Sequence, residues 1–247
     1  MSYIVILEVA LVILLTTTIR MTFGFGDALL AMPLLALIVG TKTSAPIVAI
    51  FSIIISIAII IRSKSPIFIK GFWHLFIFII LGIPIGIIYL KGTDETIVKI
   101  VLGAILVLFA SIKLFNAKLL ELKDDKYAFI FGLTSGILGG AYNTNGPPII
   151  IYGNMRNWDA DKFRLLLQGF FLPTNILIII GHYLAGLWTE TALTLLLYSL
   201  PSLVIGIIAG EVLRKIISSE KFTFYLYILL IFLGFILIFS SLYASIK

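Results

Sequence analysis

The chain has 247 residues, of which 61% are hydrophobic and 12% are charged, and its mean hydropathy is +1.18. This hydrophobic content is higher than a soluble domain needs to fill its core, so it excludes a soluble protein and indicates one embedded in lipid. The net charge of +6 comes from basic residues in short loops between apolar segments, which is typical of membrane proteins and argues against nucleic-acid binding. Without cysteine, the chain forms no disulfide and no thiolate metal site.

Eight apolar segments follow one another along the chain. A hydrocarbon core of ~30 Å needs about 20 residues of helix, and six segments meet this length without interruption: 44–61, 71–90, 97–115, 163–184, 188–210 and 222–245. The first and fifth segments, 3–39 and 127–153, are interrupted near the middle by glycine-rich, polar sequence. The predicted fold class is an all-α integral membrane protein in which each half opens with a broken or re-entrant helix.

The two halves of the chain resemble each other. Each interrupted segment has a glycine and a proline nine residues apart, and each half later carries a Gly-x-x-x-Gly pair typical of close helix packing. These positions are Gly24 and Pro33, Gly139 and Pro148, Gly82 and Gly86, and Gly206 and Gly210. The pattern predicts an internal duplication of two four-segment repeats, residues 1–117 and 127–247, joined by a solvated connector at 118–126. Together they would form a single transport domain, since neither repeat alone would close a pathway.

The distribution of Lys and Arg predicts how the segments cross the membrane. If all eight cross, the loops on the two sides hold nine and eight basic residues, which is no bias. If the two interrupted segments enter and return, thirteen face one side and four the other, with Arg20 inside the membrane. The four are Lys42, Lys91, Lys99 and Lys247, and the thirteen are Arg62, Lys64, Lys70, Lys113, Lys118, Lys123, Lys126, Arg156, Lys162, Arg164, Arg214, Lys215 and Lys221.

The re-entrant arrangement obeys the positive-inside rule, and it predicts a multi-pass protein of the cytoplasmic (inner) membrane with the basic side in the cytoplasm. Its three crossings per half would give the halves opposite orientations, as in the inverted repeats common among secondary transporters, with both termini outside. A steeply tilted or broken full crossing is the alternative, because residues 3–22 are long enough to span alone.

The break in the second half, residues 139–146, has the composition of a ligand site. Non-helical backbone inside a bilayer leaves N–H and C=O groups unpaired unless protein or a watery cavity satisfies them. Asn145 and Gly146 precede two prolines, which predicts a helix that starts near Pro147 with its positive end towards a cavity. Backbone N–H groups, amides and hydroxyls there would suit an oxyanion. The expected substrate-binding residues are Tyr142, Asn143, Thr144, Asn145 and Gly146.

The break in the first half offers the same arrangement at Gly24 and Gly26, with Asp27 where the helix restarts. Arg20 and Asp27 both lie inside apolar sequence, where a charge costs roughly 2.5–3.5 kcal/mol at mid-membrane. A mutual ion pair that closes the break is one interpretation. Alternatively, Arg20 is the counter-charge of the substrate and Asp27 carries the coupling proton. For both breaks the plainer hypothesis is packing glycines and capping residues without a ligand.

Two polar residues mark one face of the segment 163–184. Gln168 and Asn175 are seven positions apart, hence two turns along a helix, so they are expected to line the same cavity, with interhelical hydrogen bonds as the alternative. His74 and His182 have no second metal ligand at the right spacing, and no phosphate-binding loop or nucleophile–base pair is evident. We therefore expect no metal, no cofactor and no enzymatic activity.

The two glycine-rich breaks followed by proline, together with the stretch Asp161-Lys-Phe-Arg164 that opens the next helix, resemble the TauE/SafE family of membrane anion exporters over nearly the whole chain. The Gly-x-Gly-Gly-Gly core of that family stands here as Gly24-Phe-Gly-Asp-Ala28 with Pro33 downstream, so two of its glycines are replaced, by Asp27 and Ala28. The second break fits the family well. The resemblance implies a substrate such as sulfite, a sulfonate such as sulfoacetate, or another small organic anion.

The resulting hypothesis is a secondary transporter that binds a small sulfonate, sulfite or carboxylate between the two breaks at mid-membrane and moves it by alternating access, coupled to protons. A passive anion channel is the alternative, and a membrane enzyme is the less supported third class. The expected partners are the small anion, the lipid bilayer and, in a homodimer, a second copy of the chain, but no nucleic acid.

Overall fold

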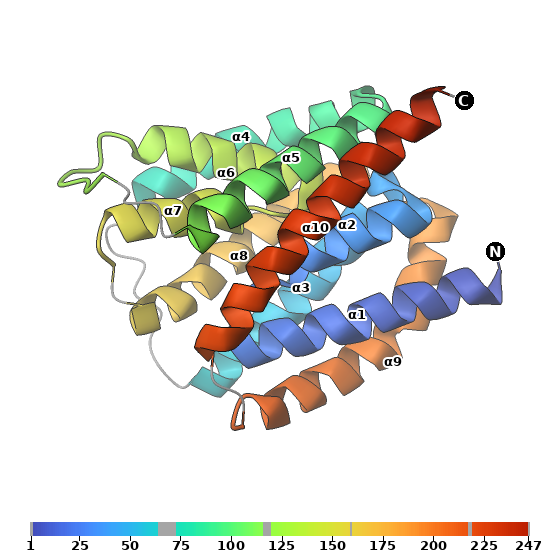
Figure 1. Ribbon diagram of the computed structural model, residues 1–247, viewed down its shortest axis with the longest axis horizontal. Coiled ribbons are helices and arrows are strands. Elements are labelled where there is room, and N and C mark those ends of the chain that lie inside the picture. The colour runs from blue at the N-terminus through green and yellow to red at the C-terminus, as the bar shows by residue number, and fades with distance from the viewer. Residues whose placement is uncertain (1, 64–72, 116–119, 159, 217–218, 247) are drawn as a thin grey trace. The chain divides into compact units, whose positions relative to one another are not determined.

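The computed structural model describes residues 2–63, 73–115, 120–158, 160–216 and 219–246, except for the side chains of 160–165, 219–223 and 245–246. Ten α-helices and no strand occur in this part of the chain (Figure 1). They are α1 (Tyr3–Phe23), α2 (Asp27–Val39), α3 (Thr41–Ser63), α4 (Trp73–Gly92), α5 (Glu95–Leu114), α6 (Ala128–Tyr142), α7 (Gly146–Met155), α8 (Ala160–Leu184), α9 (Glu190–Leu213) and α10 (Ser219–Ile246).

The all-helical fold class is confirmed, and both expected interruptions are present. The six uninterrupted segments correspond to α3, α4, α5, α8, α9 and α10. Each interrupted segment consists of two helices, α1 and α2 in the first half and α6 and α7 in the second. The half-helix α7 begins at Gly146, one residue before the expected start.

Seven helices are long and apolar enough to cross a membrane, as judged by length and composition in the described residues. They are α1, α3, α4, α5, Leu166–Leu184 of α8, α9 and Phe224–Ala244 of α10. The first interrupted segment therefore contains a helix of spanning length, whereas α6 has only 15 residues and α7 only 10. A multi-pass membrane protein follows, while the inverted repeat stays a prediction.

Labelling of single cysteines tests that topology, because the chain has no cysteine of its own. We expect a membrane-impermeant thiol reagent to reach Lys123→Cys and Arg214→Cys only from the cytoplasmic side and Thr93→Cys only from outside, as the split of basic residues requires. Lys247, also expected outside, lies beyond the described residues, as do Lys64, Lys70 and Lys118. Labelling of positions 93 and 123 from the same side would rule out the inverted repeat.

The helices form two packing units. Unit 1 comprises residues 1–44, 92–118 and 189–247, and unit 2 comprises 45–91 and 119–188. Unit 1 thus contains α1, α2, α5, α9 and α10, and unit 2 contains most of α3 together with α4, α6, α7 and α8. Each unit combines the interrupted segment of one half with helices of the other half. The repeat boundary at 118–126 stays a prediction, because such an exchange of helices is compatible with a duplicated sequence.

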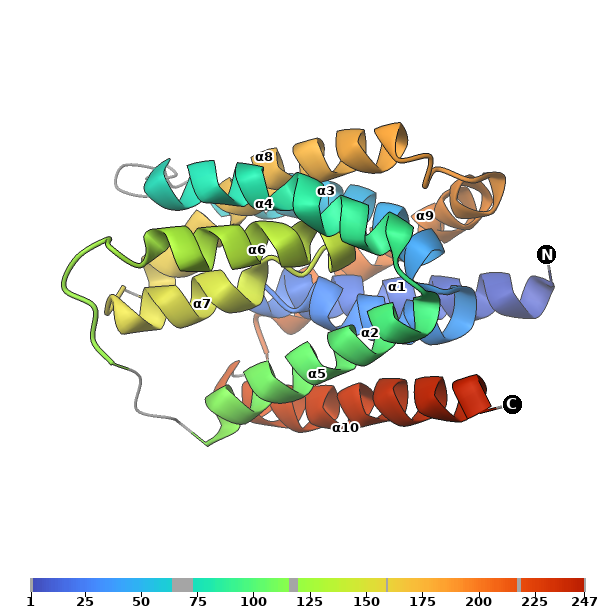
Figure 2. The same cartoon turned by 90° about the horizontal axis from the view of Figure 1, so that it is seen from above.

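Small residues make these helix contacts possible. In unit 2, Gly82 and Gly86 of α4 lie against the backbone of α6, where a Cβ atom at Gly86 would collide with the carbonyl oxygen of Ile137. In unit 1, Gly210 of α9 lies against α1, where a Cβ atom added at Gly210 would collide with the Cβ atom of Met21. Each Gly-x-x-x-Gly pair thus packs against the first helix of the other half. Helices α5 and α10 also run side by side, with glycine at their contact (Figure 2).

Alanine at Gly86 is expected to lower the free energy of unfolding by about 1–3 kcal/mol, the usual cost of overpacking, because α4 and α6 must separate to admit the methyl group. Thermal denaturation in detergent micelles measures the change. Gly92→Ala on the same helix is the matched control, since no heavy atom lies within 4 Å of its added Cβ. Equal melting temperatures for the two variants would mean that α4 and α6 are not in backbone contact there.

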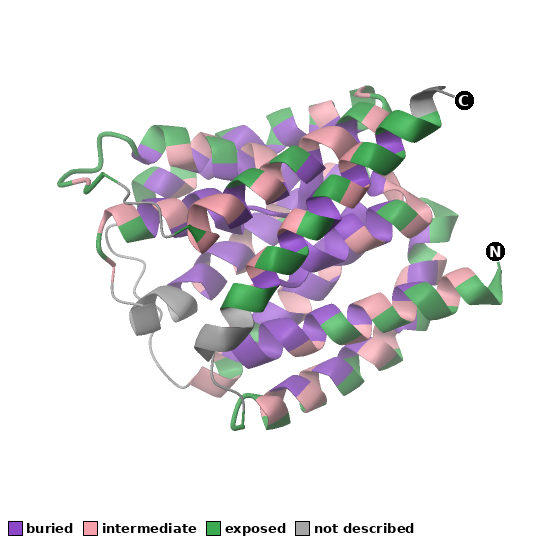
Figure 3. Ribbon diagram, viewed as in Figure 1, coloured by how far each residue is buried: buried purple, intermediate pink, exposed green. Residues whose placement is uncertain are grey.

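The short helix α2 is buried over most of its length (Figure 3), including every residue from Asp27 to Pro33. A helix that is apolar all round lies inside a protein or in lipid, because it has no face that suits water. Asp27 is the exception at its first position, and it is only 6% exposed. The first break therefore places a carboxyl group in an apolar interior.

Candidate functional site

The break in unit 2 begins where α6 ends, at Asn143. This residue has a left-handed backbone with φ of 55°, a conformation that Asn adopts more readily than other non-glycine residues. Its N–H group donates to Gly139 O at 2.8 Å, and the N–H of Thr144 donates to Leu138 O at 3.3 Å. The turn thus satisfies the last carbonyl groups of α6 while the chain reverses towards α7.

The start of α7 differs in one respect from the donor-rich pocket expected from the sequence. Gly146 is the first helical residue, and Pro147 and Pro148 follow it. Proline suits the first turn of a helix, but it has no N–H group, so two of the backbone donors expected at this helix end do not exist. The positive end of the helix dipole remains, and side chains must supply most of the hydrogen-bond donors.

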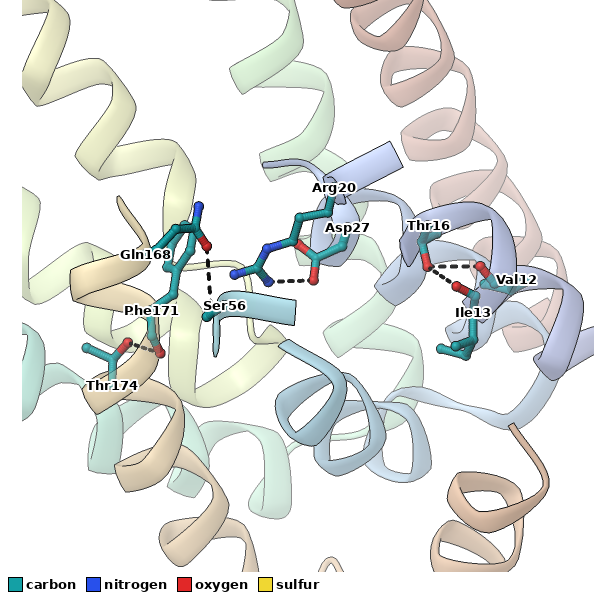
Figure 4. A network of polar contacts seen from close by, with 9 residues as sticks. All are labelled: Val12, Ile13, Thr16, Arg20, Asp27, Ser56, Gln168, Phe171 and Thr174. Atoms are coloured by element: carbon teal, nitrogen blue, oxygen red, sulfur yellow. Dashed lines mark hydrogen bonds and ion pairs between the residues drawn. The ribbon is translucent and has the colours of Figure 1, made fainter. Parts of the chain in front are cut away.

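Asn145 is held by both neighbouring helices. Its carbonyl oxygen accepts a hydrogen bond from Ser135 Oγ of α6 at 2.7 Å, and its Nδ2 donates to Thr174 Oγ1 of α8 at 3.0 Å. Thr174 Oγ1 in turn donates to the carbonyl oxygen of Phe171 (Figure 4) and to that of Phe170, both in its own helix. The Asn145 amide therefore positions the break.

Asn143 and Thr144 present polar atoms that have no partner. Each residue is 2% exposed, and Asn143 Oδ1, Asn143 Nδ2 and Thr144 Oγ1 are buried without a hydrogen bond. A buried polar atom left unsatisfied costs about 1–3 kcal/mol. Three such atoms on adjacent residues, at the positive end of α7, are what a site for a polar ligand requires.

The remaining expected site residues of unit 2 lie on α6 and α8. Tyr142 is buried, with its hydroxyl 3.3 Å from that of Tyr89 on α4. Gln168 Oε1 accepts a hydrogen bond from Ser56 Oγ of α3 at 3.3 Å (Figure 4), the interhelical bond named as its alternative role. Asn175 is 1% exposed, and its Oδ1 has no partner. Like Asn143 and Thr144, Asn175 thus has a buried side-chain atom without a hydrogen-bond partner.

Glycine shapes the break in unit 1. Gly24 and Gly26 have φ values of 86° and 100°, where any other residue would be strained. Helix α1 ends at this point, with the N–H of Gly24 donating to Arg20 O at 2.6 Å. Thr22 Oγ1 donates to the carbonyl oxygens of Thr18 and of Gly210 on α9. Both glycines therefore serve the backbone reversal between α1 and α2.

Arg20 and Asp27 form an ion pair across this break. Arg20 Nη1 lies 2.7 Å from Asp27 Oδ2, and the side chains are 1% and 9% exposed (Figure 4). The pair joins the last turn of α1 to the first turn of α2. In a bilayer such pairing offsets much of the cost of burying both charges. The ion-pair interpretation of these two residues therefore matches the geometry.

His182 was not among the expected site residues, yet the structure places it beside the second break. Its Nε2 lies 2.9 Å from Gly140 O in the last turn of α6, and the ring is fully buried. The sequence contains a signal for it, because His182 continues the seven-residue spacing of Gln168 and Asn175. In the described residues, no three His, Asp or Glu side chains converge as a metal site would require.

Comparison with known proteins identifies a family for this chain. The family model described as Sulfite exporter TauE/SafE matches residues 9–237, which include both breaks. No curated protein and no solved structure matches the chain. Part of the resemblance noted in the sequence, Asp161 to Arg164, involves side chains outside the described residues.

Proposed function

Because the chain belongs to the TauE/SafE sulfite exporter family, we propose that it is a secondary transporter that moves sulfite or a related sulfonate or carboxylate across the cytoplasmic membrane. The observation that carries this proposal is the set of unpartnered polar atoms on Asn143 and Thr144 at the second break. They lie where α7 begins, and helix starts attract anions through their dipole and free N–H groups.

The proposed site uses neutral donors. Asn143 Nδ2, the Thr144 hydroxyl and the N–H of Gly146 would donate to the oxygens of the anion, while the bonds of Asn145 to α6 and α8 hold the break in place. Hydrogen bonds to a charged group are stronger than those to a neutral one, so a small oxyanion gains more here than a neutral solute. Asn175 on α8 is a further proposed contact.

We propose that transport proceeds by alternating access and is coupled to protons, with Asp27 as a coupling group in the first break. Support comes from a carboxyl group that is buried at a helix start and paired with Arg20. A passive anion channel would share the donor-lined break, but it would not accumulate its substrate. Saturable flux that follows an imposed pH gradient in proteoliposomes separates the two functions.

Alanine at Asn143 is expected to weaken sulfite binding by roughly tenfold to 100-fold, because one hydrogen bond to a charged group contributes about 1.5–3 kcal/mol and ~1.4 kcal/mol is tenfold. Isothermal titration calorimetry on the purified chain measures the change. Asn154→Ala is the matched control, since Asn154 is an exposed residue of α7.

Asn145→Ala is expected to weaken binding as well, and to destabilise the break because it removes the bond to Thr174. Asn143→Ala removes no such bond, but alanine is strained at the φ of 55°, so Asn143→Gly, which tolerates this backbone, accompanies it as the control for strain. Wild-type affinity in both alanine variants, on folded samples, would mean that the break is purely structural and that the anion binds elsewhere.

A further inference from the structure

A polar stripe runs along one face of α8, and His182 is its last member. Gln168, Asn175 and His182 are spaced seven residues apart, which places them on one side of the helix two turns from each other. All three are buried, with exposures of 0%, 1% and 0%. Two of them have a side-chain atom without a partner, Asn175 Oδ1 and His182 Nδ1.

The single hydrogen bond of His182 fixes its tautomer. A carbonyl oxygen only accepts, so the contact of 2.9 Å with Gly140 O requires a proton on Nε2. In the neutral ring Nδ1 then carries a lone pair, and this atom is buried without a hydrogen bond. A proton can therefore bind at Nδ1 without breaking the bond that holds the ring.

The surroundings of His182 favour such a proton only in part. Gly140 belongs to the last turn of α6, and the C-terminal end of a helix attracts cations. However, no carboxylate occurs on α6 or on α4, which packs beside His182 through the contact of Ile87 with Gly181. The titratable or charged groups on these elements are Tyr142, His74, Tyr89 and Lys91, with Tyr183 next to His182 on α8. A protonated His182 thus lacks a negative partner within these helices.

The proposed anion site lacks the opposite charge. Among the described residues of unit 2, no Lys or Arg side chain is buried, so the donors that these residues offer an anion at the break are neutral groups and a helix dipole. His182 is bonded to Gly140, three residues before Asn143. A bound anion would therefore lack a positive partner in unit 2, and a protonated His182 would lack a negative one.

We propose that His182 takes up one proton at Nδ1 when an anion binds at the break of Asn143 to Gly146, so that imidazolium and anion neutralise each other in unit 2. This inference rests on the proposed function. The proton comes from water and adds to the Nδ1 lone pair, and no covalent bond breaks. Because linkage is reciprocal, the anion must raise the proton affinity of His182 by the same factor by which the proton raises anion affinity.

The first arm of the test measures the affinity of the purified chain for methanesulfonate by calorimetry between about pH 5 and about pH 8. A sulfonate stays fully ionised over this range, so any pH dependence of its affinity belongs to the protein. The expected wild-type result is an affinity that decreases as the pH rises, by at most about tenfold per pH unit for one linked proton.

Two variants locate the effect. His182→Gln keeps an amide that can donate to Gly140 O but does not titrate, so its affinity should be weaker and independent of pH. His74→Gln is the matched control, because His74 is exposed beside Trp73 and is the other histidine of the chain. Wild-type pH dependence in His182→Gln would overturn the inference.

The second arm observes the proton directly. Nuclear magnetic resonance of the ring-labelled protein should show two histidines, and His74→Gln assigns them. The midpoint of the His182 titration should move to higher pH on saturation with methanesulfonate. Binding of the anion with an unmoved His182 titration would overturn this inference and leave the proposed function standing. Failure of both methanesulfonate and sulfite to bind at any pH would overturn the proposed function, and this inference with it.

Discussion

Replacement of Arg20 by methionine is expected to lower the free energy of unfolding by about 3–5 kcal/mol, the usual cost of leaving a buried charge without its partner. In the native protein Arg20 is fully buried and lies 2.7 Å from Asp27. Methionine fills a similar volume, so the change removes the charge and little packing. Thermal or denaturant unfolding in detergent micelles measures the loss.

Two controls separate charge from packing. The double variant with Arg20→Met and Asp27→Leu removes both charges, so it should recover most of the lost stability. Arg214→Met should change stability by less than about 1 kcal/mol, because Arg214 is exposed and its contact with Glu211 is a surface ion pair at 3.4 Å. If Arg20→Met were as stable as Arg214→Met, the pair would contribute nothing to holding α1 and α2 together.

The sequence predicted where the helices break, because the residues there have direct backbone consequences. Glycine at 24 and 26 permits positive φ, and the consecutive prolines at 147 and 148, which lack N–H groups, suit the first turn of a helix. Such effects are local, so they can be recognised without the fold. The length of α1 is also visible in the sequence, but whether it crosses the membrane depends on its neighbours.

The contacts of a residue were harder to predict from the sequence than the positions of the helix breaks. A Gly-x-x-x-Gly pair indicates close packing without naming the partner helix, and only the structure shows Gly86 against α6 and Gly210 against α1. The same limit applies to side chains. Asn143 and Asn145 look equivalent in the sequence, yet the amide of Asn145 is bonded to Thr174, whereas that of Asn143 is buried without a partner.

His182 illustrates a different limit. A single histidine near the end of an apolar segment is most often a structural residue, so it drew no functional expectation. The role proposed for His182 depends on its contact with Gly140, which is 42 residues away in the chain. The seven-residue spacing shared with Gln168 and Asn175 was the available signal, and it becomes persuasive only when all three side chains are seen to be buried.

Asparagine at Asp27 is expected to abolish accumulation of sulfite driven by an imposed pH gradient in proteoliposomes, while binding measured by calorimetry remains within about tenfold of wild type. Asparagine has nearly the same shape and can still accept a hydrogen bond from Arg20, but it neither ionises nor carries a proton. The proposed binding residues, Asn143 and Thr144, belong to unit 2 and are unchanged. Loss of transport with retained binding would therefore assign coupling to Asp27.

The matched control is Asp94→Asn at the start of α5. Asp94 likewise lies at a helix start, where it accepts a hydrogen bond from the N–H of Thr96 at 2.8 Å. Asparagine caps a helix as well as aspartate does. This variant should accumulate sulfite like wild type. If Asp27→Asn also accumulated sulfite, with the pH dependence of wild type, Asp27 would have no part in coupling. The ion pair with Arg20 would then be structural.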